Sequence, residues 1–200
     1  MYHRTLTSAL QVNIHAYDIT KCVEAQKEYL VLGMVWQIIK IQLLSTINIK
    51  ETPELVVLLK DEEELKDLLA LPPEDILLRW FNYHLEKAGT DRRVKNFTND
   101  LKDAKNYVYL LNQIDANAMG LAPLELSDAK DRAREVIKGA KAIDVPAIIQ
   151  PKDIVQGNRN LNLAFVAQIF NTNNGLKMSE EEEKLIEQAG ILEDDTVSGR

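Results

Sequence analysis

The chain has 200 residues, of which 46% are hydrophobic and 28% charged, and it carries a formal net charge of −7. This composition is typical of a soluble chain with one or two compact domains, and it excludes collagen-like, low-complexity and disulfide-scaffold proteins. The one cysteine, Cys22, cannot form an internal disulfide, and residues 1–10 lack the continuous apolar stretch of a secretory signal. We therefore expect a cytoplasmic protein.

The negative charge is concentrated near the C-terminus. Residues 177–200 contain eight acidic and three basic side chains, so they account for −5 of the total, and the rest of the chain is nearly neutral. No basic face is evident in the sequence, whereas a specific nucleic-acid binder usually has one. We therefore expect no nucleic-acid partner.

The first predicted element is a helix over residues 29–44, which is apolar around most of its circumference. This pattern predicts a buried helix of about four turns. The segment is shorter than the roughly 18 to 20 uninterrupted apolar residues that span a bilayer, and Lys40 would lie inside the membrane. We expect neither a transmembrane segment nor a membrane partner.

A second helix is predicted to start at Thr52 and Pro53, which suit the N-cap and the first helical position. The acidic stretch beginning at Asp61 is a candidate break that would split this helix in two. The two prolines at 72 and 73 end it and start a strongly amphipathic helix over residues 74–88, for which Gly89 supplies the C-terminal stop.

The rest of the chain also has helical spacing. After a polar, partly basic loop over residues 90–98, helices are predicted at 103–114, 127–142 and 160–171, with a short turn at 151–155. Ser179 begins a capping-box pattern for a marginal helix or a linker. No segment alternates with period two between hairpin turns, so the predicted fold class is all-α.

Signatures of catalysis are missing from the sequence. It has no phosphate-binding loop, dinucleotide fingerprint, metalloprotease motif or nucleophile elbow. The histidines His3, His15 and His84 are far apart, and His84 is expected to pack within its helix. The acidic runs lack the ligand spacing of an EF-hand calcium loop. These observations favour a binding or structural protein over an enzyme, with no cofactor and no metal.

Several long segments resemble a known family. Residues 30–41 (LVLGMVWQIIKI) resemble the last long helix of a calponin-homology domain, with its Leu-Gly-x-x-Trp-x-Ile-Ile core. Residues 77–85 (LLRWFNYHL) are similar to the first helix of the following domain in the fimbrin (plastin) family of actin crosslinkers. The similarity continues through residues 94–97, 100–103, 109–114 and 157–167. Core positions in these motifs are Trp36, Trp80, Phe81, Leu110, Leu111, Leu163, Phe165 and Val166.

The resemblance implies a domain plan. Residues 1–48 correspond to the C-terminal part of a first calponin-homology domain, 49–71 to a helical linker, 72–176 to a complete second domain, and 177–200 to an acidic linker or tail. The implied fold is a helical bundle with a long buried central helix. The family's calcium-binding module and second actin-binding pair have no counterpart in the sequence, so calcium control and crosslinking by one chain are not expected.

The resemblance also implies a partner, F-actin, and a place in the bundling of the actin cytoskeleton. Of the family's three actin-binding segments, two have counterparts, at residues 27–44 and 72–89, and the first helix of the first domain has none. From the amphipathic pattern, the outward-facing candidates are Gln37, Lys40 and Gln42 on the first segment, Arg79, Asn82, Tyr83, Glu86 and Lys87 on the second, and the loop bases Arg92, Arg93 and Lys95. Because actin filaments are acidic, the basic members of this set are expected to help binding.

An alternative is a truncated scaffold module that does not bind filaments. The helix at 29–44 has lost most of the partners that would cover its apolar circumference in the family. An exposed surface of that kind favours self-association through the incomplete first domain.

Overall fold

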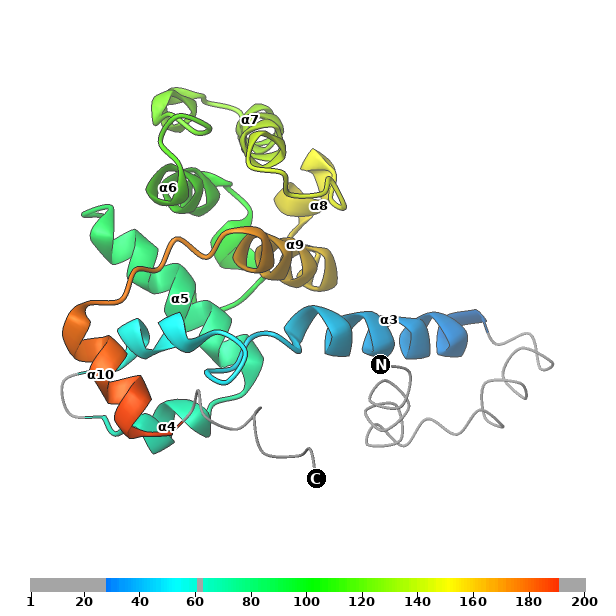
Figure 1. Ribbon diagram of the computed structural model, residues 1–200. Helices are drawn as coiled ribbons and strands as arrows, with labels where there is room; N and C mark the ends of the chain where they lie inside the picture. Colours follow the sequence, from blue (N-terminus) through cyan, green and yellow to red (C-terminus); the bar gives the residue numbers. More distant parts are fainter. Residues whose placement is uncertain (1–27, 61–62, 191–200) are drawn as a thin grey trace. The chain divides into compact units, whose positions relative to one another are not determined.

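The computed structural model describes residues 28–60 and 63–190 (Figure 1). The regular elements within these ranges are all helices, so the predicted all-α class is confirmed. The chain divides into two compact units, Met1–Ser45 and Thr46–Arg200. No helix among the described residues is long and apolar enough to cross a bilayer.

The described part of the first unit is the helix α3 (Glu28–Leu44). The predicted helix is therefore confirmed, but its predicted burial is wrong, because the side chains of Tyr29 and Leu32 are 69% and 68% exposed. Apolar residues around a helix show that it can be buried, but the helix is buried only where other elements pack against it. Cys22, His3 and His15 lie outside the described residues.

The second unit begins with two short elements. The first, η1 (Pro53–Leu58), is a 3₁₀-helix with Pro53 in its first turn, and the second is α4 (Leu65–Leu69). Thr52 does not cap the first turn with its side chain, because its Oγ1 donates a hydrogen bond to the carbonyl of Thr46 (2.8 Å). The predicted split into two short helices is confirmed, although Asp61 itself lies outside the described residues.

The amphipathic helix α5 (Pro73–Lys87) follows, and it starts and ends as the sequence predicts. Proline occupies its first turn, and Gly89 (φ +68°) adopts the left-handed conformation that ends the helix. The amide of Thr90 then donates to the carbonyl of Leu85 (3.3 Å). The buried face of α5 consists of Ile76, Leu77, Trp80, Phe81, His84 and Leu85.

The remaining helices of the domain are α6 (Lys105–Ile114), α7 (Ala129–Ala142), α8 (Pro151–Gln156) and α9 (Arg159–Thr172), with short 3₁₀ turns η2 (Asn99–Leu101) and η3 (Ala122–Glu125). The prediction of a turn at 151–155 is wrong, since α8 is a helix there. Gln150 and Asp153 cap each other's backbone at its start, and Gly157 (φ +71°) ends it. The sequence search missed this box because it begins with glutamine rather than serine or threonine.

The core forms where α5, α6 and α9 pack together, with α9 in the middle of the helices (Figure 1). The ring of Trp80 meets that of Phe170 edge to face (centroids 5.2 Å apart), and Tyr107 lies between Phe81 and Phe165 (5.8 and 5.5 Å). Helix α9 is buried on nearly all sides and is the expected central helix. The predicted core residues of the second domain are all buried: Trp80, Phe81, Leu110, Leu111, Leu163, Phe165 and Val166.

The acidic segment after the domain contains the helix α10 (Glu180–Gln188). Ser179 and Glu182 form the predicted capping box, with the Ser179 amide donating to the Glu182 carboxylate (2.7 Å). Ile186 is fully buried, and α10 packs against η1. Residues 180–188 are therefore a docked helix, anchored by one apolar side chain.

Candidate functional site

A groove of about 770 Å³ lies beside the C-terminal half of α5. One wall is formed by residues 57–60, at and after the end of η1, and the other by residues 93–95 of the loop that follows α5. The fold thus brings three separate stretches of sequence to one place. Seven of the eleven predicted site residues line the groove: Arg79, Asn82, Tyr83, Glu86, Lys87, Arg93 and Lys95.

The groove is basic although the chain as a whole is acidic. Its lining includes five cationic side chains, those of Lys60, Arg79, Lys87, Arg93 and Lys95, and one acidic side chain, that of Glu86. The sequence alone does not show this groove, because the five cations come from three stretches that only the fold brings together. Lys60 was missed for the same reason, since it lies outside the amphipathic pattern of α5.

Arg79 makes an ion pair at one end of the groove. Its Nη1 and Nη2 donate to the two carboxylate oxygens of Glu63 (2.5 and 3.0 Å), and Nη1 also approaches the carbonyl of Leu58 (3.4 Å). Hydrogen bonding from Arg79 holds the pKa of Glu63 below its ordinary value. The pair ties the segment after η1 to α5, and it neutralises Arg79. Glu63 has no signal in the sequence that would have placed it at this site.

Asn82 fixes the opposite wall. Its Nδ2 donates to the carbonyl of Val94, and its Oδ1 accepts from the amide of Val94, both at 2.8 Å. A reciprocal pair of this kind uses both ends of the amide and sets the position of the loop relative to the helix. Asn82 therefore positions residues 93–95 and is not a free contact residue.

The remaining predicted residues form the open rim. Lys87 Nζ lies 4.6 Å from the centre of the Tyr83 ring, a cation–π contact, and both Lys87 and Glu86 are exposed. Arg93 Nη1 donates to the carbonyls of Thr90 and Arg92 (2.9 and 2.8 Å), which orients its guanidinium without cancelling its charge. Arg93 and Lys95 are exposed. The rim thus presents oriented positive charge to solvent.

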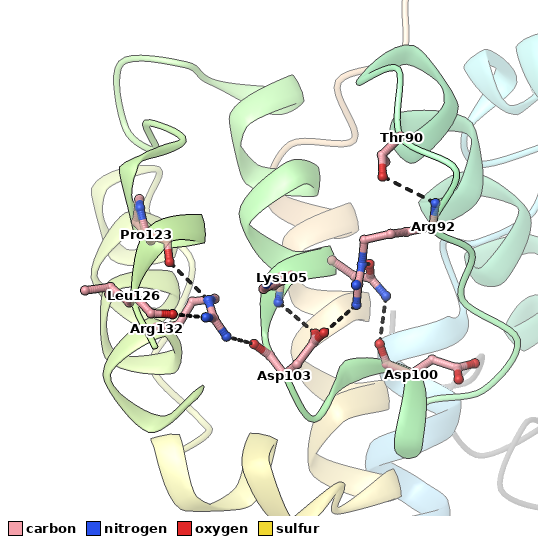
Figure 2. A network of polar contacts seen from close by, with 9 residues as sticks. Thr90, Arg92, Asp100, Asp103, Lys105, Pro123, Leu126 and Arg132 are labelled. Atoms are coloured by element: carbon pink, nitrogen blue, oxygen red, sulfur yellow. Dashed lines mark hydrogen bonds and ion pairs between the residues drawn. The ribbon is translucent and has the colours of Figure 1, made fainter. Parts of the chain in front are cut away.

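Arg92 is directed elsewhere, into the polar network of Figure 2. Its Nε donates to Asn106 Oδ1 (2.5 Å) and its Nη2 to Asp103 Oδ2 (2.6 Å). The carbonyl of Asp103 in turn accepts from the buried Arg132 (2.5 Å), which also donates to the carbonyls of Pro123 and Leu126. Arg92 therefore joins the loop after α5 to α6 and does not line the groove.

A comparison with known proteins identifies the family to which this fold belongs. The sequence profile of the calponin homology (CH) domain matches residues 71–175, a range that contains α5 to α9 and one wall of the groove. The chain belongs to the calponin-homology family. Residues 57–60, the other wall of the groove, precede the CH match.

Relatives of this CH protein include fimbrins and plastins, as the sequence motifs indicate. The chain is 50% identical over 173 residues to fimbrin of Saccharomyces cerevisiae, covering 86% of the chain and 26% of that protein. It is 43% identical over 190 residues to fimbrin-4 of Arabidopsis thaliana, covering 94% of the chain and 28% of the relative. The chain spans about a quarter of the length of these relatives.

A solved structure supports the same relationship. The actin-crosslinking core of Schizosaccharomyces pombe fimbrin matches the chain with a TM-score of 0.66 and 41% sequence identity. The match covers 85% of the chain and 32% of that structure. The predicted calponin-homology fold is thereby confirmed.

Three predicted site residues lie outside the CH match. Gln37, Lys40 and Gln42 are on α3, in the first compact unit. Gln37 and Lys40 are three residues apart and share a face of the helix, whereas Gln42 lies on a different face. Gln37 and Gln42 are exposed, and Lys40 is half-buried.

His84 of the CH domain belongs to the core and not to the groove. Its Nε2 lies 2.9 Å from the carbonyl of Asn174, which also accepts a hydrogen bond from Trp80 Nε1 (2.7 Å). Burial lowers the pKa of His84 to about 4, so the ring is neutral at pH 7. The predicted packed histidine is confirmed, and it fastens the segment after α9. Within the described ranges, no group of three or more His, Cys, Asp or Glu side chains is arranged to hold a metal ion.

Proposed function

We propose that this chain binds actin filaments through the groove beside α5 and forms part of a fimbrin-like crosslinking protein. The observation that carries the proposal is that seven of the predicted residues line one basic groove, together with a separate stretch, residues 57–60. The family supports it, because its relatives include fimbrins and a plastin and the matching structure is the actin-crosslinking core of a fimbrin. In this role the chain acts by binding, without catalysis, in the cytoplasmic actin cytoskeleton.

The groove offers two kinds of contact. Its floor and walls include the apolar side chains of Val57, Leu58, Leu59 and Val94, which can supply buried area. Its rim carries Lys60, Lys87, Arg93 and Lys95, which are exposed and can orient an acidic filament. We assign Asn82 and the Glu63–Arg79 pair to holding the walls of the unbound groove, and the rim cations to the first contact with the partner.

We also propose the domain plan implied by the family. Residues 1–48 end a first calponin-homology domain, 49–71 link it to the second domain at 72–176, and 177–200 lead onward. In this plan Gln37, Lys40 and Gln42 belong to a second contact surface, on α3. The compact-unit boundary at 45/46 and the CH match at 71–175 support the plan.

The test is charge reversal on the rim. The double substitution Lys87→Glu/Lys95→Glu should weaken cosedimentation with actin filaments about tenfold, because two attractive charges become repulsive. The matched control is Lys130→Glu/Lys152→Glu, which makes the same charge change at exposed positions on α7 and α8. Equal binding by both variants, with unchanged circular dichroism, would contradict the groove as the binding surface.

Self-association through α3 is a second candidate, supported by its exposed apolar side chains. The large exposed residues of α3 are Tyr29, Leu30, Leu32, Val35, Ile38 and Ile39. If this surface pairs two copies, light scattering should show a mass that rises with concentration, and Leu32→Glu should hold the chain at the monomer mass. A constant monomer mass for the unmodified chain would reject this candidate.

A further inference from the structure

The ion pair between Glu63 and Arg79 places a carboxylate beside a groove whose lining carries five cationic side chains and one acidic side chain, that of Glu86. Both oxygens of Glu63 face the two terminal nitrogens of Arg79, at 2.5 and 3.0 Å. This two-point arrangement is the geometry with which arginine recognises carboxylates from a partner protein. Glu63 thus occupies the recognition face of Arg79 from within the chain.

The other groove cations make different contacts in the described part of the chain. Lys87 lies over the Tyr83 ring, and Arg93 donates to backbone carbonyls. Those contacts orient positive charge but do not neutralise it. The charge of Lys60 also acts on Glu63 and helps to lower its pKa, but the two-point ion pair of Glu63 is with Arg79. This pairing is the one that an incoming carboxylate has to replace.

We propose that Glu63 is an internal competitor for the groove: the partner contributes an acidic segment, and one of its carboxylates replaces Glu63 on Arg79. The proposal rests on the proposed filament-binding function and names the chemistry of the segment that enters the groove. Because the exchange trades one carboxylate for another on the same guanidinium, it costs little. Glu63 thereby lowers the affinity of the groove and restricts it to acidic segments.

The geometry allows this exchange. The side chains of Arg79 and Glu63 are 19% and 26% exposed, so the pair lies near the surface and is not sealed in the core. Because both side chains are in contact with solvent, an incoming carboxylate can reach the guanidinium while Glu63 turns out toward water. Glu63 also accepts a long hydrogen bond from the amide of Lys60 (3.4 Å), a contact that a glutamine side chain can keep.

The decisive variant is Glu63→Gln, compared with Glu64→Gln. Both remove one negative charge with little change of shape, and the two residues are adjacent. Glu64 is 72% exposed and pairs with Lys66, so it controls for the change in net charge alone. Cosedimentation with actin filaments should give a Kd about two- to fivefold lower for Glu63→Gln, and a Kd for Glu64→Gln close to that of the unmodified chain.

A second pair of variants shows whether Glu63 competes with the partner for Arg79 or only holds the wall of the groove. In an Arg79→Gln background the guanidinium is gone, so Glu63→Gln should no longer tighten binding. If Glu63 only holds the wall in place, Glu63→Gln should instead weaken binding in the unmodified background. Weaker binding, or binding equal to that of Glu64→Gln, would overturn the proposal while leaving filament binding intact.

Titration with a short polyglutamate peptide gives a readout that does not depend on filaments. Chemical shifts of the amides of residues 93–95 report on groove occupancy, and Glu63→Gln should bind the peptide more tightly than Glu64→Gln. If no variant sediments with filaments, the proposed function fails. The internal competition then stands or falls on the peptide titration alone, and equal peptide binding by both variants would overturn it.

Discussion

Helix α5 has two faces that are held by different kinds of interaction. Its inner face packs Leu77, Phe81 and Leu85 against the core, with no exposed area. Its outer face carries Arg79 and Asn82, whose side chains reach across to segments on either side and fix the walls of the groove. The inner face is stabilised by burial and tolerates no loss of volume, whereas the outer face depends on a few directed polar contacts.

The largest expected effect is on the inner face. Phe81→Ala removes a fully buried ring that contacts Trp80 and Tyr107, and it should lower the free energy of unfolding by about 3–5 kcal/mol. Glu86→Ala, an exposed change on the same helix, should alter it by less than about 0.5 kcal/mol. Urea denaturation of both variants measures the difference. If Phe81→Ala and Glu86→Ala lowered the free energy of unfolding by similar amounts, the two faces of α5 would not differ in their contribution to stability.

The contrast explains which features the sequence could predict. Burial of Trp80 and Phe81 follows from apolar residues spaced three and four apart, because one helix face must pack inward. The walls of the groove do not follow, since Lys60 and Glu63 reach α5 only through the fold. Arg92 shows the same limit: it looks outward in a polar loop, yet its side chain enters the network with Asp103 and Asn106. Periodicity reports the environment of a helix face, not the partner of a particular polar side chain.

A smaller but pH-dependent effect is expected at His84, on the inner face. Its neighbours are the rings of Trp80 and Tyr83, the carbonyl of Asn174 and the charge of Lys87. Nδ1 is buried with no hydrogen-bond partner, so protonation would leave a buried charged donor unsatisfied. Burial and the charge of Lys87 favour the neutral ring, and they outweigh the hydrogen bond to Asn174, which favours the protonated ring.

The sign of the pH dependence follows from this preference. The pKa of His84 is about 4 in the folded state, against 6.5 for an ordinary histidine. Above pH 6.5 both states are neutral and stability does not depend on this group. As the pH falls from 6.5 to 4, the unfolded chain binds a proton that the folded chain does not, and stability drops by up to about 3 kcal/mol. The difference between the unmodified chain and His84→Gln, measured by urea denaturation at each pH, isolates this contribution from that of the carboxylates. A constant difference across this range would contradict the assignment.

The smallest effect on stability, and the most informative about the outer face, is expected at Asn82. Asn82→Ala removes both hydrogen bonds to Val94 and should lower the free energy of unfolding by about 1–2 kcal/mol, because the Val94 amide and carbonyl lose their partners. Hydrogen exchange at the Val94 amide should accelerate far more than exchange in α9. Filament binding should weaken as well, since residues 93–95 carry two of the rim cations. Asn82→Asp keeps an acceptor for the Val94 amide but loses the donor to the Val94 carbonyl, and it adds a negative charge. If the Val94 amide still exchanges slowly in this variant while filament binding weakens, the weaker binding is caused by the added charge. If the Val94 amide exchanges rapidly in both variants, the weaker binding is caused by a displaced wall. The outer face of α5 would then differ from the core beneath it in that a single side-chain amide, that of Asn82, sets its shape.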